Sequence, residues 1–254
     1  MNSTIKKYLF GCSSIIIIFV VWQIISVAEN NNYVFPGIGE IFANIGKILT
    51  DIKSLKVLGI TLLNVVVVIF IAFGIALLIS FIYILIPHSI YFFKPIINIL
   101  KAAPFAIISI YILYAFYEYR DIAPSIVAFL VIFPLMIEGI IGAIDNIDKA
   151  IIDDLKLLDI NPFKKFIHVY VPLCVPFIVT TFLQSFGLGL KVMIMSEYMN
   201  QVEDTIGGTL VNLKGNLEGY GPLLAWLIII IVIVAIGDML VKLISKHSKI
   251  ISTK

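Results

Sequence analysis

The sequence predicts an all-α, polytopic membrane protein with about six transmembrane helices. Composition is the first reason: of 254 residues, 61% are hydrophobic and 13% are charged, whereas soluble domains carry about 45–50% apolar and roughly 25% charged residues. A core of this size cannot hide that surplus, so much of the apolar surface must face lipid. Long apolar runs are the second reason, because a helix needs about 20 apolar residues to cross a bilayer. The net charge of +2 is too small to suggest a nucleic-acid partner.

Six apolar runs have the length of a membrane-crossing helix. They are expected over residues 8–28, 58–86, 96–117, 122–144, 171–196 and 222–244. The first begins like a signal peptide, but it is too long and no small-residue cleavage site follows, so we expect a retained anchor. Residues 30–57 carry apolar residues near helical spacing, which predicts either a helix along the membrane surface or a plain loop with one short helix.

The distribution of lysine and arginine predicts the orientation. With the N-terminus inside, the cytoplasmic segments carry 11 of these residues and the outer segments carry 5. Cytoplasmic loops are enriched in Lys and Arg, so both termini are expected in the cytoplasm. The chain then divides into an anchor with an outer segment (1–57), a transmembrane domain (58–244) and a cytoplasmic tail (245–254).

A polar insert near residue 153 interrupts the apolar sequence. Its first part, AIIDDLKLL, predicts a helix with four apolar residues on one face, namely Ile151, Ile152, Leu155 and Leu158. Asn161 is a good N-cap and Pro162 a good first helical residue, so a second short helix, PFKKFIHVY, is expected to start there. Two short amphipathic helices joined by a tight turn are therefore predicted on the cytoplasmic side. They either lie on lipid headgroups or dock into a partner.

This insert resembles the "EAA" loop of ABC importer permeases. Asp153, Asp154 and Leu155 fall on the E-A-A positions of that pattern, Asp159 falls on its glycine, and Pro172 on its proline. The spacing fits, although the alanines and the glycine are replaced. Asp adopts left-handed backbone more readily than most other non-glycine residues, so we expect the turn to be retained at Asp159. The loop is expected over about residues 148–171.

Other stretches match the same family in order. They are VFPGIGEI, TLLNVVVVIFIAFGIALLIS, NILKAAPFAIISIYIL, FPLMIEGI and KVMIMSEYM. Together they cover about residues 34–244 and are most similar to permeases of the nitrate/sulfonate/taurine type. The resemblance implies the type I ABC importer permease fold. It also implies a second permease copy or paralogue, two ATPase subunits and an extracytoplasmic substrate-binding protein in a bacterial cytoplasmic membrane.

The resemblance further implies that this chain is a non-catalytic subunit. It has no G-x-x-x-x-G-K-[ST] sequence, so ATP is expected on the partner subunit and no cofactor on this chain. Aromatic side chains of the loop are expected to anchor the ATPase. The residues expected to couple the two subunits are Asp153, Asp154, Asp159, Asn161, Pro162, Phe163, Lys164, Lys165, Phe166, Tyr170 and Pro172. In the alternative, Lys164 and Lys165 hold the loop on anionic headgroups.

Ionisable residues within the apolar runs are candidates for the translocation pathway. They are Lys191, Glu197, Lys101 and Glu138. A charge at mid-helix costs about 2.5–3.5 kcal/mol on insertion scales, so such residues usually face a cavity or a partner. Lys191 is the best candidate to meet an anionic solute, with a salt bridge to Glu138 or snorkelling as alternatives. Lys101 is expected to snorkel, and Glu138 to be a structural or gate partner.

The remaining features predict packing. Pro104, Pro134, Pro172 and Pro176 are expected to bend helices. Cys12 and Cys174 are expected as small buried hydrophobes, and the three histidines lack metal-ligand spacing, so no metal site is predicted.

Two other kinds of transporter stay open at this stage. One is an ion-coupled secondary transporter, although no internal repeat is evident. The other is an ABC permease for a thiamine-precursor pyrimidine. An intramembrane enzyme is disfavoured, because the histidines and carboxylates do not pair at one depth.

Overall fold

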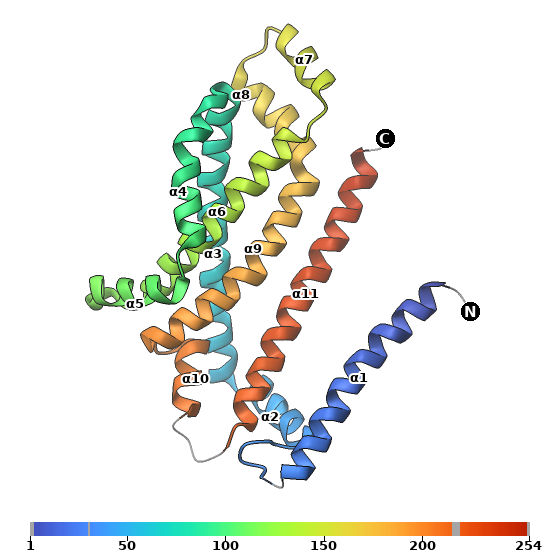
Figure 1. Ribbon diagram of the computed structural model, residues 1–254, viewed down its shortest axis with the longest axis vertical. Helices are drawn as coiled ribbons and strands as arrows, with labels where there is room; N and C mark the ends of the chain where they lie inside the picture. Colours follow the sequence, from blue (N-terminus) through green and yellow to red (C-terminus); the bar gives the residue numbers. More distant parts are fainter. Residues whose placement is uncertain (1–2, 30, 215–218, 253–254) are drawn as a thin grey trace. The chain divides into compact units, whose positions relative to one another are not determined.

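The structure is a computed structural model that describes residues 3–29, 31–214 and 219–252. Within these ranges it contains helices and no strand (Figure 1). The α-helices are α1 (Ser3–Glu29), α2 (Ile38–Thr50), α3 (Ile52–Leu85), α4 (Ile90–Ala102), α5 (Phe105–Ala115), α6 (Ala123–Asp145), α7 (Lys149–Leu157), α8 (Pro162–Lys165), α9 (Val171–Asn200), α10 (Ile206–Lys214) and α11 (Gly221–Ser252). A π-helical segment (Phe166–Tyr170) joins α8 to α9, and short 3₁₀ turns precede α4 (Pro87–Ser89) and α6 (Tyr117–Tyr119).

The chain divides into two compact units. Unit 1 comprises Met1–Lys56 and Leu210–Val232, and unit 2 comprises Val57–Thr209 and Ile233–Lys254. In unit 1 the turn between α1 and α2 is fixed by side chains of α1. The Trp22 indole donates to the carbonyl of Pro36 at 3.0 Å, and the Ser26 hydroxyl donates to that of Phe35 at 2.9 Å. The helix predicted within residues 30–57 is confirmed as α2, and its position along the membrane surface stays a prediction.

Helices α6 and α9 pack closely against each other in unit 2. A side chain at Gly139 of α6 would have its Cβ atom 2.2 Å from the Thr181 hydroxyl oxygen of α9. Likewise, a Cβ atom at Gly189 of α9 would lie 2.6 Å from Cδ1 of Ile132 of α6. Small residues let two helix backbones approach closely in membranes. The two glycines therefore set the spacing of this helix pair.

Three helices are long and apolar enough to cross a membrane, namely Ile52–Leu85, Ala123–Asp145 and the continuous stretch Pro162–Asn200, by length and composition in the part of the chain that is described. Shorter apolar stretches occur at Ser13–Glu29 and Gly221–Gly237. These five helices fall on the predicted runs at 8–28, 58–86, 122–144, 171–196 and 222–244.

The predicted run at 96–117 is not one continuous helix. It is divided between α4 and α5, which meet at a bend of 95°, so that the pair forms a broken span or a re-entrant loop. Ala103 has an extended backbone (ψ 126°) and Pro104 (ψ 118°) precedes the first turn of α5. A residue before proline is disfavoured in the helical region, because the proline ring clashes with its backbone. Pro104 therefore ends one helix and starts another, instead of bending a single helix as predicted.

Buried hydroxyl groups hold α5 against α9. The Ser109 and Ser196 hydroxyl oxygens lie 2.8 Å apart, and the Asn200 amide nitrogen donates to the carbonyl oxygen of Ser196 at 2.6 Å and to the hydroxyl of Ser109 at 3.2 Å. All three residues are buried. These hydrogen bonds hold α5, the helix that follows the break at Pro104, against α9.

Candidate functional site

The polar insert folds as two consecutive capped helices. The Asp148 side chain caps α7 by accepting from the backbone N–H of Ala150, at 3.0 Å. The Asn161 side chain caps α8 by accepting from the N–H of Phe163 at 2.9 Å, and Pro162 occupies the first turn. The predicted N-cap and helix start are thus confirmed. Each cap satisfies a backbone donor that has no partner inside its own helix.

The second helix of the insert is not a separate short element, in contrast to the prediction. It continues through the π-helical segment Phe166–Tyr170 into α9. Pro172 lies in the first turn of α9 and has no N–H to donate to a carbonyl one turn earlier. The chain accommodates the missing donor with one wider turn instead of a break. The second helix of the insert is therefore a continuous extension of α9, and a short turn joins it to α7.

The turn between α7 and α8 differs from the one expected. Leu158 has an extended backbone (φ −80°, ψ 124°), and Asp159 does not adopt a positive φ. Among the described non-glycine residues, positive φ angles occur only at Gln201 and Asp204. The expectation that Asp159 would take the left-handed conformation of a glycine is wrong. The turn is closed in another way, through a lysine side chain described below.

The predicted coupling residues differ in exposure. Eight are exposed, namely Asp153, Asp154, Asp159, Asn161, Pro162, Phe163, Lys164 and Pro172, whereas Lys165 and Tyr170 are half-buried. Phe166 is only 5% exposed. It packs against Phe81 of α3, with ring centroids 5.3 Å apart. The hypothesis that Phe166 anchors a partner subunit is therefore corrected, because its ring belongs to the core.

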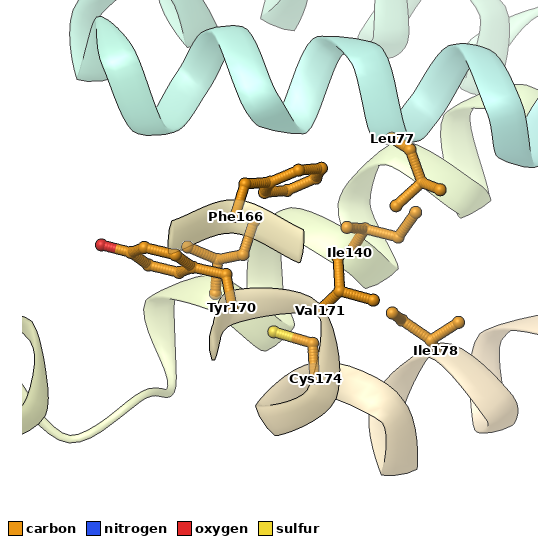
Figure 2. A pocket seen from close by; sticks show the side chains of 8 residues that line it. Leu77, Ile140, Phe166, Tyr170, Val171, Cys174 and Ile178 are labelled. Atoms are coloured by element: carbon orange, nitrogen blue, oxygen red, sulfur yellow. The ribbon is translucent and has the colours of Figure 1, made fainter. Parts of the chain in front are cut away.

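Figure 2 shows how the insert is anchored to the helices behind it. Phe166, Val171 and Cys174 line a narrow apolar gap together with Leu77 of α3 and Ile140 of α6. Cys174 is buried and unpaired with another cysteine, as predicted for a small hydrophobe. The insert thus continues into α9, packs against Phe81 of α3 and shares an apolar gap with Ile140 of α6.

The insert has an exposed apolar tip, in which Leu158 and Phe163 were predicted as apolar or contact residues and Leu157 and Ile160 were not. We define the tip as Leu157, Leu158, Ile160 and Phe163. Leu157 is 85% exposed and Phe163 is 58% exposed. Of the four residues predicted on the apolar face of α7, Leu155 is buried, Ile152 is half-buried, and Ile151 and Leu158 are exposed. Because α7 ends at Leu157, Leu158 and Ile160 lie beyond the helix, and helical periodicity in the sequence does not predict their positions.

A second group of candidates forms a charged face on α4, α6 and α9. The Lys101 ammonium donates to both carboxylate oxygens of Glu138, at 2.8 and 2.9 Å. Both side chains are about half exposed, at 52% and 43%. Lys101 therefore pairs across to α6 instead of snorkelling, and Glu138 pairs with Lys101 and not with Lys191. Lys101 lies in the last turn of α4, where a positive charge also suits the helix dipole.

Two neighbouring hollows lie in this region, and the ion pair lines the first of them. The first has a volume of about 430 Å³ and is lined by Lys101, Glu138 and the chain around Pro104. The second has a volume of about 520 Å³ and is lined by Thr180, Gln184 and Lys191. Leu135 and Leu188 line both hollows, so the two are neighbours. We call the polar residues Lys101, Glu138, Thr180, Gln184 and Lys191 the charged face.

Glu197 lies in a different environment from the charged face. It is 1% exposed, and its carboxylate accepts from the Thr61 hydroxyl at 3.0 Å and from the N–H of Gly207 at 3.1 Å. The Thr61 oxygen in turn accepts from the N–H of Ile206 at 3.1 Å. Glu197 therefore holds α3, α9 and the start of α10 together. In this structure it does not line either hollow, contrary to its prediction as a pathway residue.

Glycine is required beside this carboxylate. A Cβ atom at Gly207 would lie 2.3 Å from the backbone nitrogen of Tyr198, and one at Gly208 would lie 2.0 Å from the carbonyl oxygen of Val202. We call Thr61, Glu197, Ile206 and Gly207 the carboxylate cluster. Within the part of the chain that the structure describes, no three His, Cys, Asp or Glu residues are grouped to hold a metal ion.

Comparison with known proteins identifies the family. Residues 89–250 match the family described as "Binding-protein-dependent transport system inner membrane component". The chain belongs to this family. The match includes the insert and the whole charged face, and it makes the protein a membrane-embedded, multi-pass permease subunit of an ABC transporter. No curated protein matches the sequence.

The fold agrees with a solved structure of the same class. The chain is similar to one in "Inward facing conformations of the MetNI methionine ABC transporter: CY5 native crystal form", with a TM-score of 0.65 and 15% identity. The similarity covers 76% of this chain and 95% of that chain. The predicted type I ABC importer permease fold is confirmed.

Proposed function

We propose that this permease forms the translocation pathway for a small anionic solute, of the nitrate, sulfonate or taurine kind, in an ATP-driven importer. The charged face carries the proposal. Its three charged residues stand on helices of a membrane-embedded protein, and all three are exposed. Exposure of such residues to lipid costs about 2.5–3.5 kcal/mol each at mid-helix. The face therefore borders water or a second permease, which is either another copy of this chain or a paralogue.

The charge balance of the face favours an anion. Glu138 neutralises Lys101, whereas Lys191 forms no ion pair within the described residues. Gln184 and Thr180 add neutral hydrogen-bonding groups to the hollow that contains Lys191. One uncompensated ammonium beside neutral donors suits a solute with one negative charge. In this proposal an extracytoplasmic binding protein delivers the solute.

The apolar tip supports docking to an ATPase. Leu157 is 85% exposed. Phe163 is 58% exposed, although one edge of its ring packs against Phe81 of α3, with ring centroids 5.7 Å apart. An exposed apolar patch on an ordered element indicates a binding surface. Two ATPase subunits, each holding ATP, would bind the two permeases through this tip. The tip then lies in the cytoplasm of a bacterium, and both termini lie on the same side of its cytoplasmic membrane.

The first test is recovery of the ATPase with the permease. The tagged chain would be purified from cells that co-express the flanking genes, and the mass of the native complex would be measured. We expect two ATPase copies for two permeases. Leu157→Asp combined with Phe163→Asp removes the ATPase, because a carboxylate in an apolar interface is costly to desolvate.

The control places a carboxylate elsewhere, and it is matched in charge to Leu157→Asp alone. His88→Asp adds a carboxylate to an exposed position in the 3₁₀ turn before α4, outside the insert. We expect it to retain the ATPase. A permease that purifies without an ATPase, and whose transport follows an ion gradient instead of ATP, would overturn the proposed function.

A further inference from the structure

The end of helix α7 has no backbone cap of the usual kind. Many helices end with a left-handed residue just beyond the C-cap, and this residue lets following N–H groups bond to the last carbonyls. The C-cap of α7 is Leu158, so the left-handed position would be Asp159. Asp159 does not adopt a positive φ. The carbonyls at this helix end therefore need another donor.

The hydrogen bonds show which donor is missing and what replaces it. In the left-handed termination, the N–H of Ile160 would bond to the carbonyl of Leu155. Here that N–H donates instead to Leu158, at 3.0 Å. The Lys165 ammonium lies 2.6 Å from the carbonyl oxygen of Leu155 and 2.6 Å from that of Leu158. One side chain from α8 thus donates to a carbonyl in the last turn of α7 and to the carbonyl of its C-cap residue.

We infer that Lys165 is a positioning residue that replaces a glycine cap and fixes α7 against α8. Its ammonium donates to the carbonyl of Leu155 on α7 and to that of the C-cap residue Leu158, while its own backbone N–H donates to the carbonyl of Asn161 at 3.0 Å, so it ties both helices together. The bonds are charge-assisted, and the one to Leu155 is partly buried, so water competes with it less than at an open surface. Lys165 is therefore not free to bind a partner, in contrast to its predicted role as a contact residue.

The adjacent lysine provides a matched comparison. Lys164 is exposed, while the side chain of Lys165 is partly covered. The carbonyl of Lys164 lies 3.1 Å from the His168 ring nitrogen, within the same helical turn. The two side chains have the same charge and length, and only the ammonium of Lys165 bonds to α7. A difference between their variants consequently reports the cap and not the net charge.

The first experiment measures hydrogen–deuterium exchange in the purified permease alone, in lipid nanodiscs. Lys165→Met keeps an unbranched apolar side chain in place of the lysine stem and removes the donor, so we expect exchange over residues 154–160 to be about tenfold faster. Lys165→Arg retains a donor and is expected to stay close to the parent protein, and Lys164→Met is expected to leave exchange unchanged. Equal exchange in Lys165→Met and the parent, or equal acceleration by Lys164→Met, would overturn the inference.

The second experiment tests the replacement directly. Asp159→Gly is introduced into the Lys165→Met variant, because glycine can adopt the left-handed conformation and return the N–H of Ile160 to the carbonyl of Leu155. We expect exchange to return to within about twofold of the parent protein. Failure of this rescue would show that the ammonium does not stand in for a glycine cap.

The significance of the cap for transport rests on the proposed function and is measured separately. In proteoliposomes with the co-purified ATPase, Lys165→Met is expected to lower solute uptake per ATP hydrolysed, and Asp159→Gly is expected to restore it. The exchange experiments involve no ATPase, so their outcome decides the cap alone. Failure of the parent chain to recover any ATPase would overturn the proposed function and leave the exchange result standing.

Discussion

Glu138 and Glu197 are carboxylates on neighbouring membrane helices, yet their surroundings are opposite. Glu197 is buried, and protein hydroxyl and N–H groups hold its carboxylate. Glu138 is half exposed, borders a hollow and is paired with Lys101. Buried polar groups with all partners inside the chain serve the structure. An exposed ion pair on membrane helices indicates a surface that contacts water, a solute or another subunit.

The largest effect is expected at the glycine beside the carboxylate cluster. In Gly207→Ala the new methyl group would collide with the backbone of Tyr198 and with Cβ of Glu197, at 2.3 and 2.4 Å. Backbone would have to move, so we expect most of the folded protein to be lost, as measured by size-exclusion chromatography in detergent. Gly142→Ala is the control, because no atom outside its own helix lies within 4 Å of the added methyl group. Equal yields of the two variants would contradict the packing described for the cluster.

The next largest effect is a difference in the free energy of unfolding between variants of the two carboxylates. Glu197→Ala leaves the Thr61 hydroxyl and the Gly207 N–H without this acceptor in a buried site, which should lower the free energy of unfolding by about 2–4 kcal/mol. Glu138→Ala removes a half-exposed ion pair that water screens, and a loss of less than about 1 kcal/mol is expected. Denaturant unfolding in micelles measures both. The comparison fails if Glu138→Ala is the more destabilising of the two.

Solute uptake, in contrast to stability, should depend strongly on the half-exposed pair Lys101 and Glu138. Lys101→Glu places two carboxylates together across α4 and α6, and about a tenfold loss of solute uptake is expected from the repulsion. The exchanged pair, Lys101→Glu with Glu138→Lys, restores an ion pair and should recover most uptake. If the double variant is as inactive as the single one, the identity of each charge matters at its own position and the pair is not a simple contact.

A smaller effect is expected at Lys191. Lys191→Gln removes the uncompensated charge from the hollow, and the concentration of an anionic solute needed for half-maximal uptake should rise about three- to tenfold. Lys191→Arg keeps the charge and should stay near the parent value. Uptake of taurine, nitrate and an aminopyrimidine would be compared in the same proteoliposomes. If the aminopyrimidine is taken up and Lys191→Gln leaves its uptake unchanged, the solute belongs to the neutral class instead.

The long helices and the start of the insert could be predicted because their signals are local. Apolar runs marked α3, α6 and α9, and the sequence Asn161-Pro162 marked the start of α8. The break at Ala103-Pro104 was missed because the proline was interpreted as a kink within one span. Its signal was nevertheless present, since a residue before proline avoids helical backbone.

The candidate site depends on long-range contacts that no local pattern contains. Thr61 and Glu197 are 136 residues apart, and Lys101 and Glu138 are 37 apart. The sequence indicated that Glu197 and Glu138 were costly in a membrane, but only the packing of the helices decides which one is buried. The role of Lys165 was equally hidden, because it depends on the backbone angles of Leu158 and Asp159.

Cysteine accessibility tests most directly whether the charged face borders water. In a Cys12→Ala, Cys174→Ala background, single cysteines would be placed at Lys191, at Leu78 on the exposed apolar surface of α3, and at the buried Met193. The proteins would be reconstituted in liposomes and treated with a charged, membrane-impermeant thiol reagent. We expect rapid labelling of Lys191→Cys, labelling of Leu78→Cys only by a lipid-soluble maleimide, and no labelling of Met193→Cys. Labelling of Lys191→Cys by the lipid-soluble reagent alone would contradict a water-lined pathway at this face.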